Sequence, residues 1–135
     1  MTGTIQERER YHLQRATFAQ ALRRLEDALE QPESEFIRDA IIQRFEFTFE
    51  MGWKTLFRYL VLKGERIAAK AWDVLPAAFE ARLIDDADTW MQLREHRNDT
   101  SHEYDQDKAA MVVQFLRGPG ITALRGLEMT MRERE

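Results

Sequence analysis

Hydrophobic residues recur at steps of three, four or seven between residues 11 and 30, and most positions between them are polar or charged. This spacing places the hydrophobic side chains along one stripe of a helix, so we predict an amphipathic helix over residues 11–30. The stripe consists of Tyr11, Phe18, Leu22, Leu25 and Leu29. Pro32 should end this helix, because the residue before a proline, here Gln31, is disfavoured in helical geometry.

A longer and more hydrophobic pattern runs from Phe36 to Gly64. We expect Ser34 to cap a second helix and Gly64 to end it. Its main hydrophobic band consists of Phe36, Ile37, Ile41, Phe45, Phe49, Trp53, Leu56 and Leu60, and Ile42, Phe47, Phe57 and Tyr59 add hydrophobic surface on other faces. A helix this hydrophobic lies at the centre of a bundle or contacts a second subunit. Because the chain has only 135 residues to cover it, we favour a homodimer.

The helical spacing of hydrophobic residues is less regular after Gly64. A third helix is predicted over residues 67–84, where Pro76 should introduce a kink or divide it into two short helices. The hydrophobic positions of this helix are Ile67, Trp72, Leu75, Phe79 and Leu83.

Acidic residues mark the starts of two more helices. Asp85, with Asp88 three residues later, is a candidate cap for a helix over residues 86–98, and Asp105 or Asp107 for a last helix. This last helix carries Met111, Val112, Phe115 and Leu116. The sequence Gly-Pro-Gly at 118–120 should break it and leave residues 118–135 as a further helix or a tail. No alternating strand pattern is present, so we predict one all-α domain over residues 1–135, an up-and-down bundle of four to five helices.

Composition narrows the class of protein. Hydrophobic residues make up 44% of the chain and charged residues 33%, a balance typical of globular domains. Cysteine is absent, which excludes disulfides and thiolate chemistry and fits a reducing compartment. With neither a secretory segment nor a long uncharged apolar run in the sequence, we expect a cytoplasmic protein without membrane contact. The net charge of −4 argues against sequence-independent duplex binding but permits a local basic site.

The stretch LREHRNDTSHEYD, residues 93–105, concentrates groups that could carry chemistry. Arg97 is permanently cationic and can bind phosphate oxygens with two nitrogens, while His102 can move a proton near neutral pH. The hydroxyl and amide groups beside them belong to Asn98, Thr100, Ser101 and Tyr104. The spacing of His96 and His102 does not favour a metal site, and no nucleotide-binding glycine loop is present. These groups suit metal-independent cleavage of RNA.

Helical geometry leaves two interpretations of this stretch open. If the helix continues through Tyr104, Arg97, Ser101 and Tyr104 share one face, whereas Asn98 and His102 share another. Arg97 and His102 would then point apart within one subunit, and a dimer axis could bring an arginine of one chain beside a histidine of the other. Alternatively, the stretch is a solvated helix end in which Arg97 pairs with Glu95 or Asp99.

The residues RNDTSHEY, 97–104, match the signature of the HEPN superfamily, in which four residues separate an arginine from a histidine and one residue separates that histidine from a tyrosine. The segment IQRFEFTFEMGWKTLFRYL, residues 42–60, closely resembles the second helix of the nucleotidyltransferase substrate-binding branch of that superfamily. The resemblance extends from the first helix to about Phe115.

The resemblance implies a dimeric helical bundle whose two signature segments line a shared cleft. It implies a metal-independent ribonuclease toxin acting on tRNA or mRNA without a cofactor, in which Arg97 and His102 are catalytic and Asn98, Thr100 and Ser101 position the substrate. It also implies a minimal nucleotidyltransferase as antitoxin, which attaches AMP to Tyr104. Two alternatives stay open: a non-catalytic subunit that presents a substrate to the nucleotidyltransferase, which the acidic Asp99 supports, and a helical dimer whose polar cleft is incidental.

Overall fold

A computed structural model describes residues 3–102 and 105–134, with the side chains of residues 3–100 and 105–134. The described residues form an all-α bundle, which confirms the predicted fold class. In chain order the helices are α1 (Ile5–Leu29), α2 (Glu35–Leu62), α3 (Ala71–Glu80), α4 (Ala87–His102), α5 (Gln106–Phe115) and α6 (Ile121–Glu133), with a π-helical turn at Leu116–Gly120 between α5 and α6. None of the described helices is long and apolar enough to cross a membrane.

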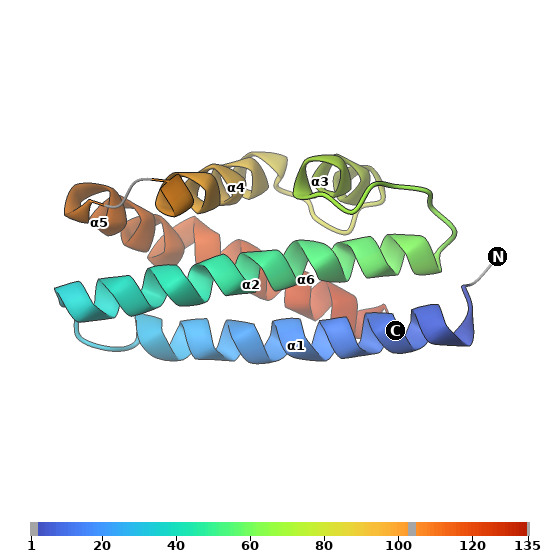
Figure 1. The fold of residues 1–135 in the computed structure, drawn as a ribbon, viewed down its shortest axis with the longest axis horizontal. Coiled ribbons are helices and arrows are strands. Elements are labelled where there is room, and N and C mark those ends of the chain that lie inside the picture. The colour runs from blue at the N-terminus through green and yellow to red at the C-terminus, as the bar shows by residue number, and fades with distance from the viewer. Residues whose placement is uncertain (1–2, 103–104, 135) are drawn as a thin grey trace.

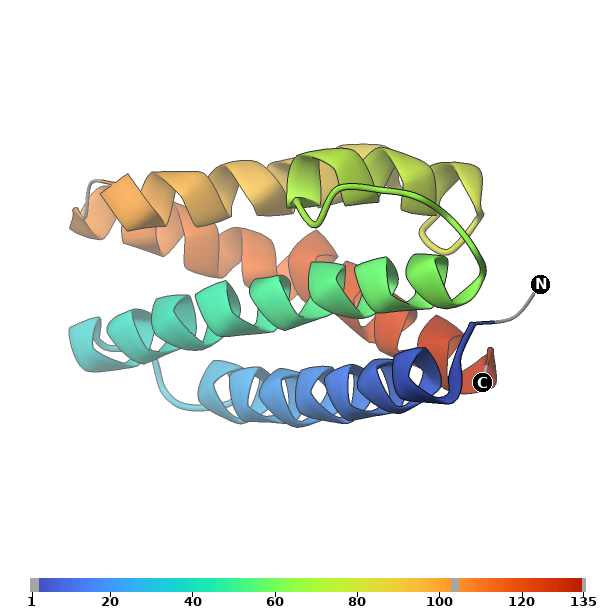
Figure 2. The same cartoon turned by 45° about the vertical axis from the view of Figure 1, so that its right-hand side comes forward.

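The second helix is the centre of the bundle, as its hydrophobic pattern predicted. It packs against each of the other α-helices, with α1 antiparallel on one side and α3 and α4 on the other (Figure 1). A view turned by 45° shows α6 crossing behind α1 and α2 (Figure 2). The fully buried Phe45, Leu56 and Phe18 belong to the hydrophobic core between these helices. Phe36, the first residue of the predicted band, is exposed and does not belong to the core, and Phe47, predicted on another face of the helix, is also exposed.

Both predicted ends of α2 are confirmed. The Ser34 hydroxyl accepts a hydrogen bond from the backbone N–H of Ile37 at 3.1 Å. At the other end Gly64 has φ of 92°, a conformation that glycine adopts without a steric penalty. The N–H groups of Gly64 and Glu65 donate to the carbonyls of Val61 and Leu60 at 2.9 Å. This paired arrangement satisfies the carbonyls at the helix end and fixes where the chain leaves α2.

The third helix is shorter than the predicted range of residues 67–84, and the predicted division into two helices at Pro76 is wrong. Only Ala71–Glu80 is helical, because Lys70 is extended, and the helix is not divided at Pro76. A proline there removes one hydrogen bond, to the carbonyl of Trp72, at a solvent-exposed position where water can replace it. Trp72 and Phe79 are exposed and do not belong to the core, which instead takes Val74 from this helix.

Capping residues set the starts of α4 and α5. Asp86, and not Asp85, caps α4: its carboxylate accepts from the backbone N–H of Thr89 at 3.1 Å and from the Thr89 hydroxyl at 2.5 Å. Both hydrogen bonds lower the pKa of Asp86, and the one from the Thr89 hydroxyl has the larger effect. Asp105 caps α5 by accepting from the N–H of Lys108 at 2.8 Å, one of the two predicted alternatives.

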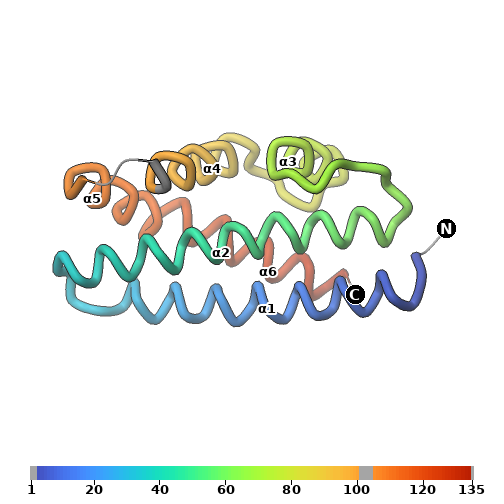
Figure 3. Tube along the Cα trace, in the orientation of Figure 1, coloured from blue at the N-terminus to red at the C-terminus, as the bar shows by residue number. Residues whose placement is uncertain are grey.

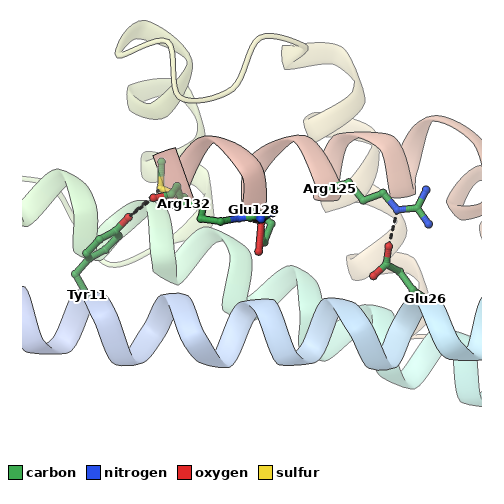
Figure 4. A network of polar contacts seen from close by, with 6 residues as sticks. Tyr11, Glu26, Arg125, Glu128 and Arg132 are labelled. Carbon is green, nitrogen blue, oxygen red and sulfur yellow. Dashed lines mark hydrogen bonds and ion pairs between the residues drawn. The ribbon is translucent and has the colours of Figure 1, made fainter. Parts of the chain in front are cut away.

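The C-terminal segment forms a helix that completes the core. Gly118 leaves helical geometry, with φ of −110° and ψ of −111°, and turns the chain from α5 into α6, as the Cα trace shows (Figure 3). The residues of α6 that are buried are Ile121, Leu124, Leu127 and Met131. Figure 4 shows two polar links from α6 to α1: the Tyr11 hydroxyl donates to the Met131 carbonyl at 3.1 Å, and Arg125 pairs with Glu26 at 2.5 Å.

Candidate RNA-binding site on helix α4

The hydrophobic residues of α4 determine where its arginines lie. Trp90 and Leu93 are buried and hold the helix against α2. Arg97 follows Leu93 by four residues, so it lies on the same side of the helix. Its side chain is only 27% exposed, although it carries a permanent charge. The sequence therefore places a guanidinium at the edge of the core, between α4 and α2.

Arg97 is held by a carboxylate from α2. Its Nη1 lies 3.7 Å from Oε2 of Glu46, and the same Glu46 oxygen accepts a hydrogen bond from the Thr100 hydroxyl at 2.7 Å. The Arg97 Nε is buried and has no hydrogen-bond acceptor among the described residues. The sequence offered Glu95 and Asp99 as ion-pair partners of Arg97. The structure shows Glu46 in this role. One donor of the guanidinium therefore makes no hydrogen bond to a described residue.

Arg97 lines a pocket of about 460 Å³ between α2, α3 and α4, which we call the arginine pocket. The residues that line it are Phe49, Glu50, Trp53, Ala71, Trp72, Arg94, Arg97 and Asn98. Arg94 lies against the ring of Trp72, with its Cζ 4.2 Å from the ring centroid. The Nε and Nη1 atoms of Arg94 are buried without an acceptor in the described part of the chain. Two guanidinium groups and two indole rings therefore line one concave site.

His96 has a different environment from the arginines. Its ring lies 4.8 Å from the ring of Phe115, centroid to centroid. Burial lowers the pKa of His96, and the charges of Asp99 and Glu95 oppose this effect. His96 is therefore a neutral, partly buried packing residue and does not line the arginine pocket.

The structure brings together part of the site predicted from the sequence. Arg97 and Asn98 line the arginine pocket, and Thr100 is tied to the carboxylate that holds Arg97. Helix α4 continues unbroken to His102, but the side chains of Ser101 and His102 lie outside those that the structure describes. Tyr104 lies outside the described residues.

Three residues of the site were missed from the sequence: Glu46, Trp72 and Arg94. Arg94 precedes Arg97 by three residues, a helical spacing that could have identified it. Glu46 and Trp72 come from α2 and α3, and no local pattern connects them to α4. Among the described residues, no group of three or more histidine, aspartate or glutamate side chains is placed to hold a metal ion.

An all-α helical bundle is the fold that the HEPN resemblance implied. Comparison with known proteins identifies the family. Residues 13–132 match the model of the family described as "Nucleotidyltransferase substrate binding protein like", and the chain belongs to this family. The resemblance seen in the sequence is thereby confirmed.

Two individual proteins are similar to the chain. A protein of Haemophilus influenzae (strain ATCC 51907 / DSM 11121 / KW20 / Rd) described as "Probable ribonuclease HepT" is 40% identical over 75 residues, which are 53% of this chain and 51% of that protein. The chain thus matches about half the length of this curated relative. A crystal structure of ttk003001694 from Thermus thermophilus has a TM-score of 0.74 and 29% identity, and the match covers 85% of this chain and 98% of that one.

Proposed function

We propose that this protein is a HEPN-type, metal-independent ribonuclease that acts as a toxin and is neutralised by a minimal nucleotidyltransferase. Two findings support a HEPN-type ribonuclease: membership of the nucleotidyltransferase substrate-binding family and the similarity to a protein described as a probable ribonuclease. The observation that carries the proposal is Arg97, a guanidinium held at 27% exposure in a concave site on the helix that ends with His102.

In the proposed reaction, His102 accepts the proton of a ribose 2′-hydroxyl. The 2′-oxygen then forms a bond to the adjacent phosphorus, the bond from phosphorus to the 5′-oxygen breaks, and a protonated histidine returns a proton to the leaving oxygen. Negative charge grows on the phosphate oxygens in the transition state. Arg97 stabilises this charge because its guanidinium stays cationic and can donate two parallel hydrogen bonds. Asn98, Thr100 and Ser101 position the substrate.

A homodimer is part of this proposal. Arg97 and His102 are five residues apart on α4, and this spacing places them on different sides of a helix. Two α4 helices that meet across a two-fold axis put the arginine of one chain beside the histidine of the other. Phe36 and Phe47, exposed on α2 at 83% and 52%, provide hydrophobic surface that such a dimer can cover.

The proposed control of the toxin acts on Tyr104. The nucleotidyltransferase would join the tyrosine oxygen to the α-phosphorus of ATP, with pyrophosphate as the leaving group. An AMP group adds negative charge and bulk beside the RNA-binding groups, so it would repel the substrate backbone and block the cleft.

Expression in cells without the nucleotidyltransferase tests the toxin. Wild-type protein should arrest growth and cleave RNA after purification, while Arg97→Ala and His102→Ala should do neither. Arg23→Ala, which removes an exposed arginine from α1, is the matched control and should stay toxic. Toxicity of the His102→Ala protein equal to that of the wild type would contradict the proposed chemistry. Intact mass after incubation with the partner and ATP should rise by one AMP, and Tyr104→Phe should abolish the increase.

A second function is favoured by the acidic groups around Arg97. Glu46 already neutralises part of its charge, Asp99 follows two residues later, and the net charge is −4. A non-catalytic subunit that presents a substrate to the nucleotidyltransferase fits these observations. For such a subunit, purified protein leaves tRNA and mRNA intact but co-purifies with its partner enzyme.

A further inference from the structure

The arginine pocket contains more cationic and aromatic surface than the signature residues account for. Trp72 is 62% exposed and Arg94 packs against its ring, yet neither residue belongs to the signature at 97–104. An exposed tryptophan is uncommon on a stable surface, because its large apolar area stays in contact with water. Its position beside two arginines suggests a ligand with both a flat ring and a negative charge.

We propose that Trp72 and Arg94 form a subsite for one nucleotide of single-stranded RNA, next to the scissile phosphate. The inference rests on the proposed ribonuclease function and adds two residues to it. A base would stack on the exposed indole of Trp72, and its phosphate would accept hydrogen bonds from Arg94. Stacking on tryptophan with an arginine alongside is a common way to hold single strands without reading their sequence.

The buried nitrogens of the arginines support a charged ligand. Nε and Nη1 of Arg94 and Nε of Arg97 have lost contact with water and have no acceptor among the described residues. A buried donor without an acceptor destabilises the protein. If the arginine side chains turn toward the pocket opening, a bound phosphate supplies the missing acceptors and removes this cost. Glu50 also lines the pocket and Glu46 pairs with Arg97, so two carboxylates offset the charge of the two arginines. The attraction for a phosphate therefore comes from the individual guanidinium groups and not from an excess of positive charge in the pocket.

The spacing of residues on α4 indicates which part of the strand would reach the subsite. Arg94 lies one helical turn before Arg97 on α4, and three residues of α-helix rise by about 4.5 Å. His102 lies on the opposite side of Arg97 along the helix. A strand with its scissile phosphate near Arg97 therefore reaches Arg94 and Trp72 with a neighbouring nucleotide. The pocket volume of about 460 Å³ is within the range of small-ligand sites.

Binding of a short fluorescein-labelled single-stranded RNA, followed by anisotropy, tests the subsite. The full chain carries His102→Ala so that the RNA is not cut. Trp72→Ala should weaken binding by about 5- to 150-fold, the usual loss for one stacked base, and Trp72→Phe should restore part of it. Arg94→Ala should reduce the slope of log affinity against log salt by about 0.7, the value for one phosphate contact on a single strand, while Arg94→Lys should retain the slope.

Matched controls change the same residue types elsewhere. Phe79→Ala removes an exposed aromatic ring from α3 that does not line the arginine pocket, and Arg23→Ala removes an exposed arginine from α1. Both variants should bind RNA like the background protein. Circular dichroism melting confirms that each variant is folded. If Trp72→Ala and Arg94→Ala bind RNA as tightly as the controls, the subsite is refuted. If these variants instead lose subunit or partner contacts while RNA affinity is unchanged, Trp72 serves a protein interface and the inference also fails.

Cleavage assays separate this inference from the proposed function. With His102 intact, Trp72→Ala should raise KM for RNA more than it lowers kcat, because it removes binding and leaves the reacting groups in place. Wild-type cleavage with unchanged KM in Trp72→Ala refutes only the subsite. Absence of both cleavage and RNA binding in the wild-type protein refutes the proposed function, and the subsite with it.

Discussion

If RNA binds at Arg97 as proposed, the carboxylate of Glu46 should compete with it, and Glu46→Gln tests this competition. At the observed 3.7 Å the direct attraction between the two charges is about 4–5 kcal/mol at an effective dielectric constant of about 20. Both side chains are about a quarter exposed, so solvent screening and desolvation reduce the net value to about 0.2–1 kcal/mol. Glutamine keeps an oxygen that can accept the hydrogen bond from Thr100, so the exchange removes mainly the charge.

A phosphate that binds Arg97 must displace Glu46 or share the guanidinium with it. Glu46→Gln should therefore tighten RNA binding by about 1.4- to 5-fold, the equivalent of 0.2–1 kcal/mol, and should lower the free energy of unfolding by no more than about 1 kcal/mol. Anisotropy with single-stranded RNA in the His102→Ala background measures the affinity, and urea denaturation measures the stability.

Glu26→Gln is the matched control for the loss of charge. Glu26 pairs with Arg125 at 2.5 Å on the other side of the bundle, so this exchange also removes one charge and one ion pair. Affinity of the Glu46→Gln protein that equals or falls below that of the Glu26→Gln protein would refute the competition. A loss of affinity would show instead that Glu46 holds Arg97 in its binding orientation.

Two further predictions concern stability. Burial lowers the pKa of His96 below its unfolded value, so the stability that the neutral ring contributes is full above the unfolded pKa and is lost as pH falls through the folded pKa. His96→Gln should therefore flatten the dependence of the free energy of unfolding on pH over this range, as measured by urea denaturation, and a pH dependence equal to that of the wild type would contradict this account. Gly126→Ala, where a Cβ has no neighbour within 4 Å, should raise the free energy of unfolding by about 1 kcal/mol. In Gly52→Ala the new Cβ lies 3.2 Å from the buried Phe18 ring, so the same substitution should give no such gain; equal stabilisation of both variants would contradict this packing argument.

The parts of the fold that local chemistry determines could be predicted from the sequence. Ser34 and Gly64 bound α2 because a serine hydroxyl caps an N-terminus and a glycine tolerates positive φ, and both effects act within a few residues. The choice between Asp85 and Asp86 depended on the position where α4 begins, which adjacent aspartates do not reveal. The hydrophobic pattern predicted a third helix from residue 67, but the chain becomes helical only at Ala71, and the pattern did not show that Trp72 is exposed.

The candidate site was predictable only along α4. The signature identified Arg97, but Glu46, which holds it, comes from a different helix and is brought close only by packing. Arg94 was missed because its partner Trp72 lies on α3, across the pocket. Tertiary contacts of this kind have no local signal, so the structure was needed to find them.

The hydrogen bond from Tyr11 to the Met131 carbonyl joins residues that are 120 positions apart. Because the ribosome makes Tyr11 long before Met131, the contacts of α1 with α2 can form earlier than those of α1 with α6. Helices α1 and α2 can pair as soon as residue 62 has left the ribosome, because they are adjacent in sequence. The buried side chains of Leu124 and Leu127 join the core only after α6 has been synthesised. A growing polypeptide therefore cannot complete this bundle before residue 133 has been added.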